Sequence, residues 1–161
     1  MDSISETYKF NDKEKVIFLN TSDILNGQIV NHNYFSTKDL PGQAKKSISK
    51  NDILYSEIRP VNKRFAFIDF DAKKYVVSTK LMVLRAINIS PYYIYFFLKS
   101  EDIINKLQQL AESRSGTFPQ ITFNQVRDIN MILPQSNLLE IFTEMLKPTY
   151  DGISKNNNQI N

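Results

Sequence analysis

Cationic, amide and hydroxyl side chains are concentrated in three short, turn-rich segments of this 161-residue sequence. Arginine and lysine donate hydrogen bonds to phosphate oxygens and to guanine, while asparagine and glutamine pair with adenine. These segments therefore predict a surface that reads DNA, with its side chains on loops held by a rigid sheet. The candidate residues are Gln43, Lys45, Lys46, Arg59, Asn62, Lys63, Arg64, Ser113, Arg114, Ser115, Gly116, Thr117 and Gln120.

Each candidate also has a structural explanation, which the sequence leaves open. Arg59 could brace the turn at the proline that follows it, and Lys45 and Lys46 could be solvated loop residues. Gly116 could cap a helix instead of letting the backbone approach DNA closely. We expect a double change of Arg59 and Arg64 to alanine to abolish DNA binding and to leave the fold intact.

The distribution of charge favours DNA binding more than the total charge does. The net charge is only +3, but residues 41–80 carry nine lysines and arginines against four acidic residues, a net charge of +5. Residues 1–40 carry a net charge of −2, and residues 81–161 are neutral. A protein that meets phosphates needs a local positive field, although a solvated lysine-rich surface would give the same pattern.

Most enzyme classes lack their required residues in this sequence. There is no cysteine, the single histidine, His32, lies in a polar segment, and the four glycines are too scattered for a phosphate-binding loop. The acidic or amide residue before Pro-Pro-aromatic that marks DNA aminomethyltransferases is missing. Asp69, Asp71 and Lys73 could belong to a metal-dependent nuclease site, but a polar turn is the simpler interpretation. We therefore expect a non-catalytic protein without a metal site.

The composition is that of an ordinary globular domain, with 42% hydrophobic and 12% aromatic residues. No apolar run approaches the roughly 18–20 residues that a membrane span needs. We expect a cytoplasmic protein without a membrane segment.

The elements that would position the three segments are mainly strands followed by helices. Ser90-Pro91 is typical of a helix N-terminus, a second helix is expected after Ser100, and Thr122 with Gln125 forms a capping-box pattern. The aromatic residues at 92–97 have helical spacing and are expected in the core. These patterns predict an α/β (α+β) fold, with a β-rich domain and flanking helices. The expected strands cover residues 16–19, 53–58, 65–70, 75–78, 81–85 and 131–134, and residues 29–50 are loop-like.

The end of the chain predicts one more helix with an apolar face. Leu139, Phe142, Leu146 and Ile153 lie on this face, and the spacing beyond Leu146 is close to that of a coiled coil. Two interpretations remain open: the start of a long coiled-coil spacer helix, or an ordinary terminal helix docked on the domain.

Taken in order, four stretches resemble the specificity subunits of type I restriction–modification systems. That family carries a K-x-D-I-L-x-S-x-x-R-P strand, a P-x-Y-x-Y-x-x-L-x-S helix, a G-[ST]-x-x-x-I loop and an I-x-L-P exit. The stretches that carry the resemblance are Lys50–Arg64, Ser90–Ser100, Ser115–Ile121 and Ile129–Pro134. Residues 142–161 are similar to the start of the family's conserved spacer helix.

The resemblance implies a DNA target-recognition domain over residues 1–136 and the start of a truncated spacer helix over residues 137–161. In this family two such domains read the halves of a bipartite site. The implied partners are double-stranded DNA, a modification (methyltransferase) subunit and a restriction subunit, and also a second recognition domain or self-association through the C-terminal helix. S-adenosylmethionine, Mg²⁺ and ATP would belong to the partner subunits, so no cofactor is expected in this chain.

The sequence departs from a whole subunit of that family. It holds one recognition domain, the usual opening strand with its glycine-bearing segment is missing, and the spacer helix is short. The alternative function is therefore a protein-interaction or assembly piece that joins a methyltransferase or a second specificity chain without strong DNA reading.

Overall fold

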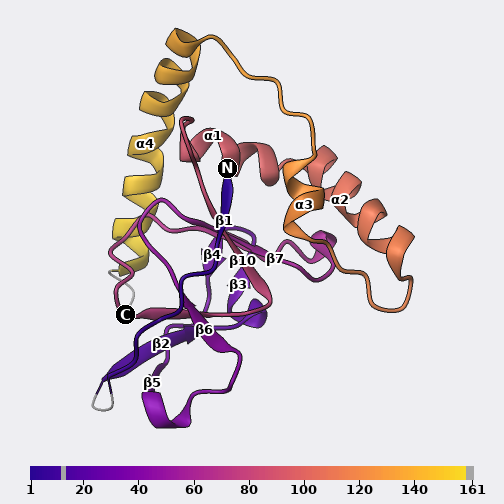
Figure 1. Cartoon of the computed structure of the whole chain (residues 1–161). Helices are drawn as coiled ribbons and strands as arrows, with labels where there is room; N and C mark the ends of the chain where they lie inside the picture. Colours follow the sequence, from indigo (N-terminus) through magenta and orange to yellow (C-terminus); the bar gives the residue numbers. More distant parts are fainter. Residues whose placement is uncertain (12–13, 159–161) are drawn as a thin grey trace.

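A computed structural model describes residues 1–11 and 14–158, with their side chains as far as residue 148 (Figure 1). Within these residues the strands form two four-stranded sheets and one two-stranded hairpin, and four α-helices follow them along the chain. The chain also contains three short 3-10 helices. They are η1 (Thr21–Asp23), η2 (Thr37–Asp39) and η3 (Pro60–Asn62).

The first sheet is antiparallel throughout, with the strand order β1-β10-β7-β8. Its strands are β1 (Asp2–Ile4), β7 (Ile53–Ser56), β8 (Phe65–Phe67) and β10 (Leu81–Arg85). Ile53 and Tyr55 belong to the apolar cluster under the helices, whereas Leu54 belongs to the cluster between the sheets. Successive residues of a strand face opposite ways, so β7 is apolar at consecutive positions because both of its faces are covered.

The second sheet has the order β5-β2-β9-β6, with β2 and β9 parallel and the outer pairs antiparallel. Its strands are β2 (Lys15–Leu19), β5 (Tyr34–Ser36), β6 (Ala44–Ser47) and β9 (Tyr75–Ser78). Ile17, Leu19 and Val77 form one buried cluster with Leu54 and Val83 of the first sheet. This apolar layer holds the two sheets together.

A small hairpin continues the first sheet beyond β8. It consists of β3 (Ile24–Leu25) and β4 (Gln28–Ile29). Its turn places Asn26 and Gly27 at positive φ, and the Gly27 N–H donates to the Phe65 carbonyl at 2.9 Å. A Cβ atom at Gly27 would lie 2.6 Å from the hydroxyl of Tyr95, so only glycine fits at this position.

The helices cover the outer face of the first sheet. They are α1 (Pro91–Leu98), α2 (Glu101–Arg114), α3 (Phe123–Arg127) and the long α4 (Ser136–Asn158). Tyr92 and Tyr95 of α1 are buried against the sheet, which confirms the core position expected for this aromatic run. In Figure 1, α4 runs down the side of the domain opposite to α2 and α3.

The strands and helices expected from the longer apolar patterns are confirmed, with 53–58 and 65–70 shortened to β7 and β8. The capping-box prediction is supported by the Thr122 N–H, which donates to the Gln125 side-chain oxygen at 2.9 Å. The prediction of a final strand over 131–134 is wrong. Ile132 and Leu133 are 87% and 65% exposed in the connection between α3 and α4, and none of the described strands pairs with them.

Two further segments differ from expectation. The polar opening forms β1, and the loop-like residues 29–50 contain β5 and β6. These are short strands at sheet edges, where one face meets solvent and an apolar run is not needed. β1 pairs with β10, β5 with β2, and β6 with β9. The partners of β1 and β6 are distant in sequence.

Candidate nucleic-acid interface

The turn that follows β7 has a constrained backbone. Arg59 and Lys63 flank η3, and both have positive φ, of 43° and 53°, a region that residues other than glycine seldom adopt. The side chain of the buried Gln108 of α2 accepts a backbone N–H of η3 at 3.3 Å, and Lys63 forms an ion pair with Glu101 of α2. Helix α2 therefore holds this turn in place.

The loop after α2 is tied to the same turn by hydrogen bonds. The Arg59 guanidinium donates to the Thr117 carbonyl at 3.2 Å, and the Arg59 backbone N–H donates to the Pro119 carbonyl at 3.2 Å. Next to them, the Ile121 N–H donates to the Glu57 carbonyl at 2.8 Å. Two of the three predicted segments, 59–64 and 113–120, thus form one continuous surface.

The candidates Ser113, Ser115 and Gly116 lie at the end of α2 and in the loop that follows it. The Ser115 hydroxyl accepts the Phe118 N–H at 3.1 Å, and the Ser113 hydroxyl donates to the Leu110 carbonyl within α2 at 2.8 Å. Gly116 is exposed, and a Cβ atom built there would meet nothing within 4 Å. The loop backbone at Gly116 is therefore open to a ligand.

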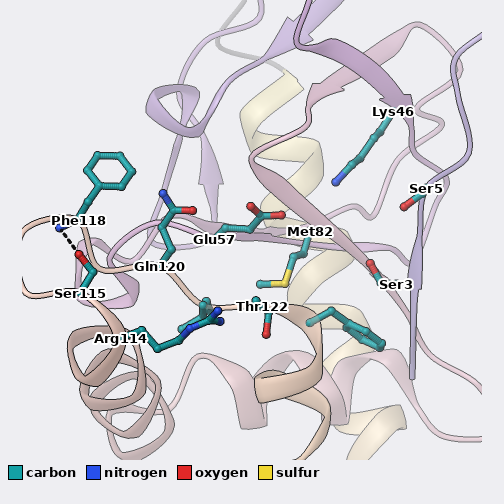
Figure 2. Close-up of a pocket in the computed structure, with 12 residues that line it drawn as sticks. Ser3, Ser5, Lys46, Glu57, Met82, Arg114, Ser115, Phe118, Gln120 and Thr122 are labelled. Carbon is teal, nitrogen blue, oxygen red and sulfur yellow. Dashed lines mark hydrogen bonds between the residues drawn. The ribbon is translucent and has the colours of Figure 1, made fainter.

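A cleft of about 460 Å³ lies beside this surface (Figure 2). Arg114 and Gln120 line it from the loop side, Glu57 lies at its centre, and Lys46 extends into it from the opposite side. The third predicted segment reaches the cleft through Lys46, while Gln43 and Lys45 lie outside its lining.

The structure corrects the expected environment of Lys46. This residue belongs to β6 and is half-buried, and its Nζ donates to the carbonyls of Thr79 at 3.2 Å and Leu81 at 2.8 Å. Burial lowers the pKa of the Lys46 ammonium, an effect that the charge of Glu57 partly opposes. Lys46 is thus a structural bridge at the cleft rather than a solvated loop residue.

Arg64 also differs from expectation. Its guanidinium donates to the carbonyls of Ser22 at 3.3 Å and Ile24 at 2.9 Å, where the chain enters β3. Arg64→Ala would remove both of these bonds, so the expectation that the change leaves the fold intact needs correction. From the sequence, the double change of Arg59 and Arg64 was expected to affect DNA binding alone. Of these two residues, only Arg59 lies at the candidate surface.

Six predicted residues have side chains that are not engaged within the described part of the chain. No side-chain hydrogen bond or ion pair joins them to another described residue, so their donors are available to a ligand without any internal bond being broken. They are Gln43, Lys45, Asn62, Arg114, Thr117 and Gln120.

Comparison with known proteins identifies the family. The model of the type I restriction modification DNA specificity domain matches residues 2–161. The chain belongs to this family. It is 44% identical over 161 residues to the HindI type I restriction enzyme specificity subunit of Haemophilus influenzae, which covers 99% of this chain. The chain spans 35% of the length of that relative.

Solved structures agree with this assignment at the level of the fold. The HsdS subunit from Thermoanaerobacter tengcongensis matches 96% of this chain with a TM-score of 0.71 at 21% identity, and this chain covers 40% of it. A chain from a structure of complex assembly in the type I R-M system matches 92% with a TM-score of 0.68 at 21% identity, and 39% of that chain is covered. The predicted family and the predicted α+β fold are therefore confirmed.

In this specificity domain, the motif of the strand β7 has mainly structural contacts. Asp52 is fully buried and pairs with the guanidinium of Arg85 through two hydrogen bonds of 2.8 and 2.9 Å. The Asp52 carboxylate holds the Arg85 charge and raises the pKa of the guanidinium. Ser56 accepts the Ile58 N–H at 3.0 Å and shapes the turn that carries Arg59. The motif thus positions the candidate interface.

Among the cleft-lining residues of the specificity domain that sequence reasoning missed, Glu57 and Phe118 bear most on recognition. Glu57 lies at the centre of the cleft, with its carboxylate 4.0 Å from the Lys80 ammonium. It belongs to the strand motif, and for that reason the sequence did not mark it as a site residue. Phe118 lines the rim and is 55% exposed. An apolar residue between a glycine and a proline fits no helix or strand period, and this signal could have marked Phe118 as a surface residue.

The first part of α4 packs on the domain. The Phe142 ring meets the rings of Tyr93 and Phe96 edge-on at centroid distances of 5.6 and 5.9 Å, and Leu146 contacts the main core. Leu139 is half-buried on the same side of the helix, and Ile153 lies outside the residues whose side chains are described. The outer side carries Leu138, Ile141 and Met145, which are 54%, 53% and 72% exposed.

The other candidate chemistries have ordinary surroundings. Lys73 pairs with Asp71 at 3.1 Å on the surface, and His32 Nδ1 lies 3.1 Å from the Tyr75 hydroxyl. Among the described residues, no three His, Cys, Asp or Glu side chains are grouped as a metal site would need. A separate search of the described helices found none with the length and apolarity for a membrane span.

Proposed function

We propose that this chain reads one half of a bipartite DNA site as the target-recognition domain of a type I restriction–modification specificity subunit. The observation that carries the proposal is the bonding of segments 59–64 and 113–120 into one rigid surface beside a cleft that holds an unengaged arginine, Arg114. In this proposal residues 1–136 form the recognition domain, and residues 137–161 begin the spacer helix.

The available side chains have the chemistry for reading bases. Arg114 can donate to guanine or to phosphate, while Gln120 and Asn62 can form paired hydrogen bonds with adenine. Glu57, the acceptor in the cleft, can accept from the amino group of cytosine. The bonds that hold Arg59 keep the turn and the loop at fixed positions, so little ordering is needed when DNA binds.

The chain acts, in this proposal, with catalytic partners that are separate proteins. A modification subunit would supply S-adenosylmethionine chemistry, and a restriction subunit would use Mg²⁺ and ATP to translocate and cut. The assignment of the chain to the specificity-domain family and its α+β fold support this arrangement. The complex would act on DNA in the cytoplasm, without catalytic residues from this chain.

One observation favours a second candidate function. Leu138, Ile141 and Met145 form an exposed apolar row on α4, with the spacing of one helix face. Such a row fits a protein-interaction role, in which α4 joins a methyltransferase, a second recognition domain or another copy of this chain. A chain that reads DNA would have this interaction role in addition. A chain that binds partner proteins but no DNA would have the interaction role alone.

The proposal is tested by the change Arg114→Ala, with Arg127→Ala as the matched control. Arg127 is also an exposed arginine, but it pairs with Asp128 and does not line the cleft. We expect Arg114→Ala to weaken duplex binding about tenfold or more and to reduce the salt slope by about one, with little effect of Arg127→Ala. Equal binding by wild type and Arg114→Ala, measured by fluorescence anisotropy with the modification subunit present, would contradict the proposal.

A further inference from the structure

Phe118 is the large apolar side chain at the rim of the cleft. It lies in the loop between Gly116 and Pro119, is 55% exposed, and in Figure 2 its ring points away from the other labelled residues of the cleft. A single exposed apolar residue is common on protein surfaces, so the inference depends on how Phe118 is held and on what lies beside it.

The backbone around Phe118 is fixed on three sides. The Phe118 N–H donates to the Ser115 hydroxyl at 3.1 Å, and the carbonyls of Thr117 and Pro119 on either side accept from Arg59 at 3.2 Å. The loop therefore presents the ring in a defined position instead of letting it fold back onto the core. A rigid aromatic side chain loses little conformational freedom when it makes a contact.

The chemistry of base edges limits what such a side chain can recognise. Phenylalanine has no hydrogen-bond donor or acceptor, so it cannot distinguish bases by their polar groups. In the major groove the base edges display one apolar group, the C5-methyl of thymine. Insertion of the ring between stacked base pairs would cost a few kcal/mol of unstacking, whereas contact with a methyl group requires no such deformation.

We propose that Phe118 recognises the methyl group of a thymine in the DNA half-site. This inference rests on the proposed function, because it places the surface of Arg59, Arg114 and Gln120 against DNA. Arg114 and Phe118 both line the cleft, so in this proposal a duplex bound by the Arg114 cation also meets the rim that carries the ring. Phe118 then sets specificity at one base pair, while the polar side chains around it act at other positions.

The test begins with selection of bound duplexes from a random pool by wild type, Phe118→Ala, Phe118→Leu and Phe10→Ala, each with the modification subunit. Phe10 is a phenylalanine with a similar exposure, 43%, outside the cleft, and serves as the control. We expect the motif of Phe118→Ala to lose its preference at one position, which is T·A in the wild-type motif. Phe118→Leu, which keeps an apolar side chain, should retain part of that preference.

Replacement of that thymine by uracil, which removes only the methyl group, gives the second measurement. We expect wild type to bind the uracil duplex about fivefold more weakly, and Phe118→Ala to bind both duplexes equally. An unchanged T preference in Phe118→Ala, a relaxed position other than T·A, or equal sensitivity of both proteins to uracil would overturn the inference alone. The absence of any motif for wild type would overturn the proposed function and this inference with it.

Discussion

The three arginines near the candidate interface differ in what they bind. Arg64 donates to two carbonyls at the entrance to β3, Arg59 holds the loop of residues 117–119, and Arg114 has no hydrogen-bond or ion-pair partner among the described residues. A guanidinium already bound to carbonyls must give up those bonds to contact DNA. Arg114 is therefore the arginine with the most to gain from a ligand, and Arg59 acts mainly as a positioning residue.

Arg64→Ala should destabilise the fold. The change removes two hydrogen bonds from a charged donor and leaves the Ser22 and Ile24 carbonyls without that partner, so we expect the free energy of unfolding to fall by about 2 kcal/mol. Urea denaturation followed by circular dichroism measures this loss. Arg114→Ala, which breaks no internal bond, is the control and should unfold at the wild-type midpoint. A wild-type midpoint for Arg64→Ala would show that these bonds do not support the hairpin.

At this scale the sequence predicts residue types well and residue environments poorly. Arg59, Arg64 and Arg114 are the same residue type, and the sequence does not distinguish them. The hydrogen-bond partners of Arg59 and Arg64 lie about 40 to 60 residues away along the chain. Arg59 and Lys63 have a left-handed backbone although neither is a glycine, so the sequence does not indicate this conformation. Tertiary contacts impose it, and no local pattern could have indicated them.

Helix α4 has two faces with different expected roles. Phe142 and Leu146 lie on the face that contacts α1 and the core, while Ile141 and Met145 lie on the exposed face. Sequence periodicity predicted an apolar helix but could not separate these faces, because both are apolar. The inner face supports docking of the helix on the domain, and the outer face remains open to a partner.

Changes on the two faces of α4 should therefore have different effects. Phe142→Ala removes a ring that packs between two aromatic rings, and we expect a loss of about 2 kcal/mol in the free energy of unfolding, less than for a fully buried phenylalanine. Met145→Ala should leave stability unchanged but weaken association with a partner protein. Thermal unfolding and co-purification with the modification subunit measure the two effects. Comparable destabilisation by both changes would contradict the assignment of the faces.

Short edge strands carry the weakest sequence signal among the elements of this fold. The buried strands β2, β7 and β10 carry continuous apolar runs and were predicted, while the edge strands β1, β5 and β6 depend on their neighbours. The apolar run at 131–134 is the opposite case, in which the sequence pattern predicted a strand that the structure lacks. None of the described strands pairs with this run; Ile132 and Leu133 are exposed, and Met131 packs against the main core.

For the molecule as a whole, the net charge of +5 in residues 41–80 does not correspond to a single basic face. Lys46 lies in the cleft, Lys63 pairs with α2, and Lys73 pairs with Asp71 at a surface turn. Cations that already have partners contribute less to phosphate binding. We therefore expect DNA affinity from a small number of contacts, and specificity from the shape of the surface formed by the turn, the loop and the cleft.

The most direct test is selection of bound duplexes from a random pool by this chain, with the modification subunit present, at two salt concentrations. We expect one enriched short motif, and for about three phosphate contacts an affinity that falls about 40-fold between 50 and 200 mM salt. Binding of the modification subunit without enrichment of any DNA motif would contradict DNA reading and leave the interaction role of α4 as the function of this chain.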